Sequence, residues 1–307
     1  MQVGDQVVTV PLRGRLFEQR ESLKSPLAVG DRVSLDVTGQ AIEARLARRS
    51  QLARAAAGEG DREQVLAANV DQVLVVTTAR QPEFRPSLVD HVLAGAERQH
   101  LTALVVINKL DLVTAAELEP LCALYRGLGY TVLPTCSLTG AGVPELRTQL
   151  CDRISVVCGQ SGVGKSSLLN AVEPGLRLKT GAVGHKSQEG RHTTTHASLL
   201  PVPGGGHVVD TPGVRNFGLF ELTAPELPWL FRDIAAVGRE CTFGDCLHRS
   251  ETDCAVRAAL GSRIAPSRYQ SYLELLEEIA SRRRQAERRP ERRGRPAPPS
   301  WEDEEEQ

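Results

Sequence analysis

The sequence contains no long hydrophobic run: no stretch of its 307 residues approaches the ~20 consecutive apolar residues that span a membrane. The first residues also lack the apolar core of a secretory signal peptide. We therefore expect a soluble, cytoplasmic protein. Neither sign of charge is in excess, because 37 Lys and Arg accompany 38 Asp and Glu, so the chain carries no overall field that would attract a polyanion.

The sequence contains seven cysteines, an odd number. An odd number argues against a secreted disulfide framework and favours metal ligands or free thiols. With 41% hydrophobic residues the chain can bury an ordinary core, which excludes wholesale disorder. Its length predicts about two domains and a small third one.

The N-terminal part has a short β-like pattern. Alternating residues at Gln6–Val10 and Arg32–Val37 are separated by turn residues such as Gly30 and Gly39. Closely spaced strands of this kind predict a small barrel. The segment Arg45–Asp61 is rich in Arg and small residues, so we expect a linker there.

The central part alternates between two kinds of segment. Apolar runs without polar alternation, typical of strands covered on both faces, lie at Val73–Val76, Leu104–Ile107 and Ile154–Cys158. Helical patterns lie between or after them, at Ser87–Arg98, Ala115–Leu128 and Pro144–Leu150. This order predicts a doubly wound parallel sheet.

The C-terminal part changes character again after about Thr223. A Cys/His cluster precedes a helical pattern over 267–284, and the last residues combine an Arg-rich stretch with the acidic run Glu302–Glu306. The expected units are a barrel with linker over 1–60, an α/β domain over 67–222, a cysteine-containing helical domain over 223–284, and a disordered charged tail over 285–307.

A phosphate-binding loop follows the strand Ile154–Cys158 and opens a helix. The segment matches G-x-x-x-x-G-K-[ST] and comprises Gly159, Gln160, Ser161, Gly162, Val163, Gly164, Lys165 and Ser166, with Ser167 next. Glycines let backbone N–H groups converge on phosphate oxygens at a helix N-terminus. Lys165 would reach the β- and γ-phosphates, and the Ser166 hydroxyl would ligate Mg²⁺.

A base-reading motif, N-K-x-D, lies at the end of the strand Leu104–Ile107. The Asp111 carboxylate suits guanine, which offers two adjacent donors, whereas adenine presents an acceptor at N1. Asn108 would brace neighbouring loops, and the stem of Lys109 would cover the base. Ser137 belongs to a later loop that resembles the one whose backbone N–H reads guanine O6.

A third motif, D-x-x-G, follows the apolar pair Val208-Val209. Asp210 would hold Mg²⁺, and the N–H of Gly213 would contact the γ-phosphate. The motifs occur in an unusual order, because the base-reading motif precedes the phosphate loop. Ordinary small GTPases begin with the phosphate loop, so the sequence resembles a circularly permuted GTPase.

Further segments narrow this resemblance. With the Gly190–Thr195 and Asp210–Arg215 segments, Ala68-Asn69-Val70-Asp71 and the Cys/His cluster, the chain resembles the RsgA (YjeQ) family of small-ribosomal-subunit-dependent GTPases. The resemblance implies an α/β fold with a circularly permuted P-loop GTPase domain, an N-terminal OB-fold β-barrel and a C-terminal zinc-binding domain with helices. It also implies a GTP hydrolase that acts in late maturation of the small ribosomal subunit and binds its rRNA. The subunit would stimulate the GTPase activity.

The residue that positions the attacking water differs from the one that small GTPases most often use. Many small GTPases carry Gln directly after D-x-x-G, and here that residue is Val214. His192 is the candidate, because a switch-loop imidazole with a pKa near neutrality suits water polarisation; a solvated surface His is the alternative. Among Thr193, Thr194 and Thr195, the resemblance favours Thr194 as the Mg²⁺ ligand.

Three thiols and one imidazole lie within fourteen positions, at Cys241, Cys246, His248 and Cys254. This set closes a tetrahedral Zn²⁺ shell without an open position, which favours a structural role. Free thiols and a redox pair are the alternatives. We expect the other cysteines to be buried small apolar residues: Cys122, Cys136, Cys151 and Cys158.

Basic side chains at both ends of the chain could contact rRNA phosphates without reading sequence. The candidates are Arg13, Arg15, Arg45, Arg48, Arg49, Arg54 and the stretch Arg282–Arg295. We expect a monomer. Two other functions stay open: an RNA-binding module that holds GTP as a structural ligand, with Val214 marking lost hydrolysis, and a P-loop ATPase or kinase, which Asp111 disfavours.

Overall fold

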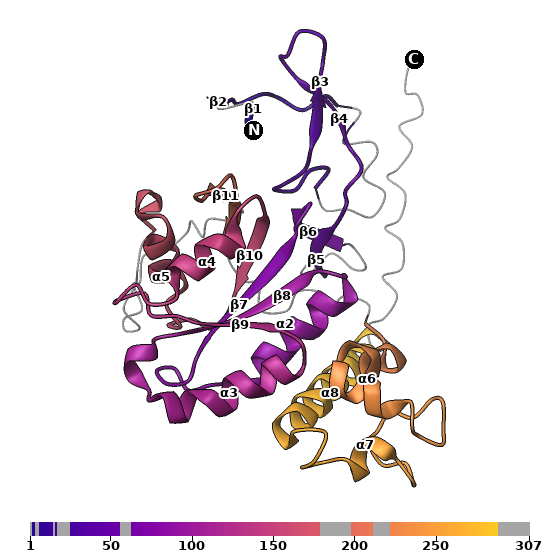
Figure 1. Ribbon diagram of the computed structural model, residues 1–307. Helices are drawn as coiled ribbons and strands as arrows, with labels where there is room; N and C mark the ends of the chain where they lie inside the picture. Colours follow the sequence, from indigo (N-terminus) through magenta and orange to yellow (C-terminus); the bar gives the residue numbers. More distant parts are fainter. Residues whose placement is uncertain are drawn as a thin grey trace, which may run out of the picture.

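The computed structural model describes residues 2–3, 6–14, 16, 25–55, 63–178, 198–210 and 222–287. Three units follow one another along the chain: short N-terminal strands, a central α/β unit and a C-terminal helical unit (Figure 1). Within the described ranges, no helix combines the length and apolar character that crossing a membrane requires.

The N-terminal unit consists of antiparallel strand pairs that fit an OB-like barrel. The pairs are β1 (Gln2–Val3) with β2 (Gln6–Val7), β3 (Val33–Leu35) with β4 (Ile42–Arg45), and β5 (Gln51–Ala55) with β6 (Glu63–Ala68). Isolated bridges join Leu12 to Ile42 of β4 and Val29 to Ala67 of β6, which add chain segments outside the strands to these two pairs.

The expectation of a linker over Arg45–Asp61 is wrong for its central part, which forms β5. Leu52 is fully buried, and β5 pairs along its length with β6, which ends at Ala68. The reason is that the inward positions of β5 include alanine, whose small side chain gives little hydrophobic signal in the sequence.

The central unit is a six-stranded sheet with the order β11-β12-β10-β7-β8-β9. All neighbours are parallel except β11, which is antiparallel to β12. The strands are β7 (Gln72–Thr78), β8 (Thr102–Asn108), β9 (Thr131–Pro134), β10 (Ile154–Cys158), β11 (Ser198–Pro201) and β12 (His207–Asp210). The tenth strand of the chain thus lies at the centre of the sheet, as a circular permutation requires.

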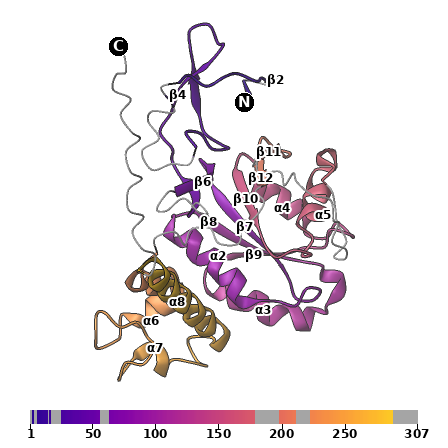
Figure 2. The ribbon, with the colours of Figure 1, turned by 180° about the vertical axis from the view of Figure 1, so that it is seen from behind.

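Helices cover both faces of this sheet (Figures 1 and 2). They are α2 (Pro86–Arg98), α3 (Ala115–Gly127), α4 (Val143–Leu150) and α5 (Lys165–Val172), with short 3₁₀ turns η1 (Leu110–Leu112) and η2 (Pro174–Leu176). Side chains of β7 alternate between the faces: Val73 and Val75 pack in the core of α2 and α3, whereas Leu74 and Val76 pack in the core of α4 and α5. This two-sided burial explains the uninterrupted apolar run.

The C-terminal unit packs on α2. It comprises η3 (Ala224–Leu230), α6 (Arg232–Gly238), α7 (Ala255–Ala258) and the long helix α8 (Pro266–Glu287). Its core includes Phe231, Ile234 and Tyr272, and Ala94 of α2 belongs to the same cluster. The two units are therefore joined by a continuous apolar contact as well as by the chain.

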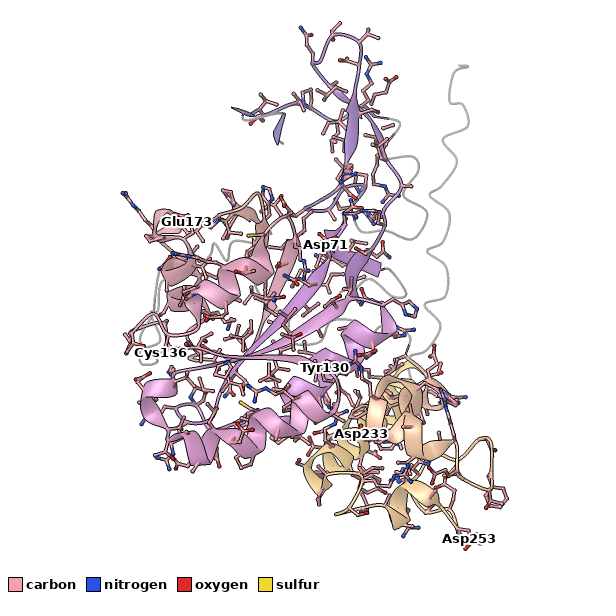
Figure 3. The ribbon with its side chains drawn as sticks, viewed as in Figure 1. Asp71, Tyr130, Cys136, Glu173, Asp233 and Asp253 are labelled. Carbon is pink, nitrogen blue, oxygen red and sulfur yellow. The ribbon has the colours of Figure 1, made fainter. Side chains whose placement is uncertain are left out.

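A buried ion cluster reinforces this junction. The Arg268 guanidinium of α8 donates 2.6 Å to Asp90 of α2 and 2.9 Å to Asp233 of α6, and its side chain is 1% exposed. The Tyr125 hydroxyl of α3 also donates to Asp90, at 3.0 Å. Asp233 marks the place in Figure 3 where the C-terminal unit faces the α/β unit. Such a desolvated cluster fixes one orientation of the two units, because moving either one would expose unpaired charges.

Candidate functional site

The loop after β10 has the conformation of a phosphate cradle. Gly159 and Gly164 have φ values of 147° and 88°, which L side chains rarely adopt. A Cβ on Gly159 would lie 2.1 Å from the Val76 carbonyl oxygen, and one on Gly164 would lie 2.5 Å from the Asn108 amide. The Lys165 ammonium donates to the carbonyls of Gly159 and Gln160, both at 2.9 Å, so its charge lies against the loop.

The Asn108 side chain connects the phosphate loop with the base-reading loops. Its Nδ2 donates 2.9 Å to the carbonyl oxygen of Val163, and its Oδ1 accepts from the backbone N–H of Ser137 at 3.2 Å. Thr135 also lies within hydrogen-bond range of that oxygen. The side chain is 1% exposed. Loops separated by more than fifty residues in the sequence are thus held at one end of the sheet, the carboxyl end where α/β proteins bind ligands.

Asp111 lies on η1, next to this junction. Its Oδ1 accepts a hydrogen bond from the Cys136 thiol at 3.1 Å. Lys109 has a left-handed backbone (φ 65°), and its ammonium donates 2.6 Å to the Gln81 carbonyl, so its stem is fixed beside Gly164. The carboxylate is exposed, as a group that receives a ligand must be.

Cys136 is a residue whose role the sequence did not reveal. It is buried, as expected, but its thiol donates to Asp111 instead of only filling space. The sequence feature that could have indicated this contact is the position of Cys136, one residue before Ser137 in the same loop. Of the other three cysteines, Cys122 and Cys158 are buried, whereas Cys151 is exposed, contrary to expectation. Cys151 directly follows α4 in a turn, where no core covers it.

Several expected site residues lie outside the described residues: His192, Thr194, Gly213, and also Thr193 and Thr195. Asp210 is the last residue of β12, and β12 pairs in parallel with β10. Its backbone therefore lies on the strand next to the one that leads into the phosphate loop. Ser166 and Ser167 lie in the first turn of α5.

The four cysteine and histidine residues of the C-terminal unit come together. The Nδ1 of His248 lies 3.5 Å from the sulfurs of both Cys241 and Cys254, and those sulfurs are 3.9 Å apart. The sulfur of Cys246 completes the set, and all four ligand atoms lie within 4.8 Å of one another. Tetrahedral Zn²⁺ with bonds of about 2.3 Å to sulfur and about 2.0 Å to nitrogen requires S···S near ~3.8 Å and S···N near ~3.6 Å. The arrangement fits a metal of this size.

The surroundings of the cluster suit metal ligation. Burial lowers the pKa of His248, which keeps the imidazole neutral, and burial raises the pKa of the Cys246 thiol to about 12. A divalent cation offsets the second effect, because it stabilises thiolates directly. The ligand loop is braced from outside: the hydroxyls of Tyr269 and Tyr272 donate to the carbonyls of His248 and Leu247 at 2.6 and 2.7 Å.

Not every arginine proposed for RNA contact is available. Arg48 makes a bidentate pair with Asp31, at 2.7 and 2.8 Å, and its side chain is only 9% exposed. It is therefore a structural residue of the barrel. Arg13, paired with Asp36, and Arg49, paired with Asp71, stay at least half exposed. Arg45 is partly buried, and the side chains of Arg15 and Arg54 lie outside the described residues.

Arg49 also belongs to a contact between the barrel and the phosphate-loop strand. The other oxygen of Asp71 accepts from the backbone N–H of Ile154 at 2.8 Å, at the beginning of β10. Asn69, with a left-handed backbone, accepts from the Arg49 N–H and donates to the Gly30 carbonyl. The Ala68–Asp71 segment therefore fixes the barrel to the strand that ends in the phosphate loop.

Known proteins resemble this chain over most of its length. A family model described as RsgA GTPase matches residues 45–220. A small ribosomal subunit biogenesis GTPase RsgA from Gemmatimonas aurantiaca is 42% identical over 278 residues, which cover 88% of this chain and 90% of that protein. The protein of the same name from Thermotoga maritima is 39% identical and covers 89% of each chain.

Two solved structures are similar in fold. The crystal structure of YjeQ from Thermotoga maritima has a TM-score of 0.68 and 38% identity, covering 88% of each chain. That of YloQ, a circularly permuted GTPase, has a TM-score of 0.64 and 30% identity, covering 88% of this chain and 86% of the other.

Proposed function

Because the chain belongs to the RsgA GTPase family and is a GTP-hydrolysing enzyme, we propose that it binds the small ribosomal subunit and acts in its late maturation. Relatives that carry the name small ribosomal subunit biogenesis GTPase span nearly the whole of this chain, so all three units are shared with them. The subunit would stimulate hydrolysis, which would take place in the cytoplasm on a monomeric protein.

The nucleotide would span the two loops that the Asn108 side chain joins. The base would face Asp111 and the N–H of Ser137, and the phosphates would lie in the loop from Gly159 to Ser167. The observation that carries this proposal is a pair of hydrogen bonds at the Asn108 side-chain amide. The amide donates to the Val163 carbonyl and accepts from the Ser137 N–H. These bonds support the proposal that the base side and the phosphate side would form one site despite their reversed sequence order.

Magnesium would enter with the nucleotide and neutralise charge that develops on the phosphate oxygens. Ser166 lies at the start of α5, which follows β10, and Asp210 ends β12, which pairs with β10; both carry the oxygen ligands that this cation prefers. Thr194 would complete the set. Lys165 would pair with the β- and γ-phosphates, and Gly213 would donate its N–H to the γ-phosphate.

His192 would orient or polarise the attacking water, because Val214 can neither donate nor accept a hydrogen bond. Intrinsic hydrolysis would then be slow, and the subunit would accelerate it by placing the imidazole beside the water. This proposal distinguishes the protein from GTPases with a Gln in the position of Val214.

The C-terminal cluster would hold one structural Zn²⁺ through Cys241, Cys246, His248 and Cys254. Four protein ligands leave no open position for substrate, and the metal would staple a unit whose own core is small. The barrel and the C-terminal unit would contact rRNA phosphates through exposed arginines, Arg13 and Arg49 among them.

The experiment that tests the proposed function measures GTP turnover with and without purified small subunits, at several salt concentrations. We expect slow turnover alone and a large increase with small subunits that weakens as salt rises. An equal rate with large subunits, or no increase at all, would contradict it. Binding of GTP without turnover under every condition would favour a structural role for the nucleotide, the alternative that Val214 suggests.

A further inference from the structure

Two exposed aromatic side chains mark the surface of the C-terminal unit. Trp229 on η3 is 60% exposed and Phe243 is 50% exposed. Within the described residues, the other exposed large apolar side chains are aliphatic and lie in the other two units: Val37, Leu46 and Leu138. Aromatic residues make up only 4% of the sequence. Exposure of two of them on one small unit therefore indicates an interaction surface rather than chance.

Both aromatic residues line one groove of about 330 Å³. Its lining also includes apolar side chains, among them Pro228, Ile234 and Leu247. This volume lies within the range of small-ligand sites, roughly 300–1,000 Å³. The groove therefore has room for one planar ring system together with the groups attached to it.

Two charged side chains, Arg239 and Asp245, also line the groove, and both are exposed. Several other exposed charges of this unit are paired, such as Arg263 with Glu240 and Arg232 with Glu97. For Arg239 and Asp245 the structure gives no ion pair among the described residues. A cation and an anion beside an aromatic groove are complementary to a ligand that has an anionic group, a polar donor and a flat apolar face.

Phe243 is flanked in the sequence by two residues of the metal cluster, Cys241 and Cys246. Both cysteines line the groove as well. A metal at that cluster would fix the loop over 241–246, so Phe243 would be preorganised instead of being ordered at binding. Preorganisation lowers the entropic cost of association.

We propose that this groove binds one unpaired nucleotide of the rRNA. The base stacks on Trp229 and Phe243, Arg239 pairs with a phosphate, and Asp245 accepts from an exocyclic amino group of the base. A nucleotide uses both charges, whereas an apolar peptide side chain would leave Arg239 and Asp245 without a role. The inference rests on the proposed function and adds a contact that recognises an individual nucleotide to those made by phosphate-binding arginines.

The chain offers a direct optical test, because it contains only two tryptophans. In the full-length Trp301→Phe variant, Trp229 alone reports on the groove. Titration with an oligocytidylate of about eight nucleotides should quench its fluorescence, and uridylate of the same length should bind more weakly because uracil has no amino group. Cytidylate contains no guanine, so it does not compete for the site at Asp111.

Variants in this background assign the contacts. Phe243→Ala should weaken oligocytidylate binding roughly tenfold, in the range of stacking losses. Arg239→Gln should weaken it and reduce its salt dependence, and Asp245→Asn should remove the preference for cytidylate. Leu46→Ala, a truncation of another exposed apolar residue, should change nothing. Metal content of each variant, measured by mass spectrometry, checks that the unit is intact.

The outcomes separate the inference from the proposed function. If wild-type protein binds small subunits while oligocytidylate leaves Trp229 emission unchanged, the groove does not bind nucleotides and the inference is wrong. A response to total ribosomal protein in place of RNA would identify a protein occupant and overturn it equally. If Trp229 responds to cytidylate as predicted but the protein neither binds small subunits nor is stimulated by them, the proposed function fails and the groove's RNA binding remains.

Discussion

The Cys136 thiol lies 3.1 Å from Oδ1 of Asp111 and donates a hydrogen bond to it. We propose that the Asp111 carboxylate accepts two donors from guanine, and this contact would hold it in position before the nucleotide arrives. Cys136→Ala should therefore weaken GTP binding roughly fivefold, about 1 kcal/mol, the usual net value of one hydrogen bond. Calorimetry with GTP and ATP measures the effect.

The matched control for this change is Cys151→Ala, which removes an exposed thiol distant from the base-reading loop. It should leave GTP affinity unchanged. Equal affinities for wild type and Cys136→Ala would show that the thiol does not position Asp111.

The second prediction concerns the junction of the α/β and C-terminal units. Arg268→Met leaves Asp90 and Asp233 buried without their cation, which should lower the free energy of unfolding by about 3–5 kcal/mol. Arg263→Met removes an exposed pair with Glu240, and we expect little change. Urea denaturation followed by circular dichroism compares the two. Similar small losses for both variants would mean that the buried cluster does not stabilise the junction.

The third prediction concerns the metal. Protein purified from cells should contain one zinc per chain, and Cys254→Ser should lose it, together with the packing of Cys246 and Tyr272 in the same core. Hydrogen exchange should rise over 222–287 and much less in the central sheet. Cys151→Ser should retain full zinc. Wild-type protein that contains no zinc yet shows the same protection of 222–287 would contradict a structural metal.

The fourth prediction concerns hydrolysis. His192→Ala should lower subunit-stimulated turnover by about a hundredfold or more, the range for loss of a group that activates water, with GTP affinity unchanged. His100→Asn is a suitable control, because His100 is exposed and its left-handed backbone suits Asn. Stimulated turnover that is unaffected by His192→Ala would remove the imidazole from the mechanism.

The sequence predicts some elements well because their physical causes are local. The strand β10 has the expected bounds, Ile154–Cys158, since four of its five residues are apolar and a glycine follows. Helix α3 begins after Thr114, whose side chain and that of Glu117 form a capping box. The candidate metal ligands could be found in the sequence because their residue types and short spacing are typical of metal sites, and the structure brings the four side chains together.

Other features depend on contacts that no local pattern encodes. Arg268 looks like a surface residue of an exposed helix, yet α2 and α6 supply two carboxylates that bury it. Arg48 is similar, because its partner Asp31 lies seventeen positions away. The edge strand β11 is antiparallel and ends in proline, so its sequence does not resemble the buried parallel strands. These features follow from tertiary packing.

The central claim is that Asp111 reads a guanine whose phosphates lie at Lys165. Asp111→Asn tests it most directly, because an amide accepts from N1–H of xanthine and donates to its C2 carbonyl, whereas it presents a donor to the 2-amino group of guanine. Calorimetry should show that this variant binds xanthosine triphosphate more tightly than GTP, reversing the wild-type order, and that adding Lys165→Ala weakens binding of both. An unchanged preference for GTP in Asp111→Asn would contradict the account.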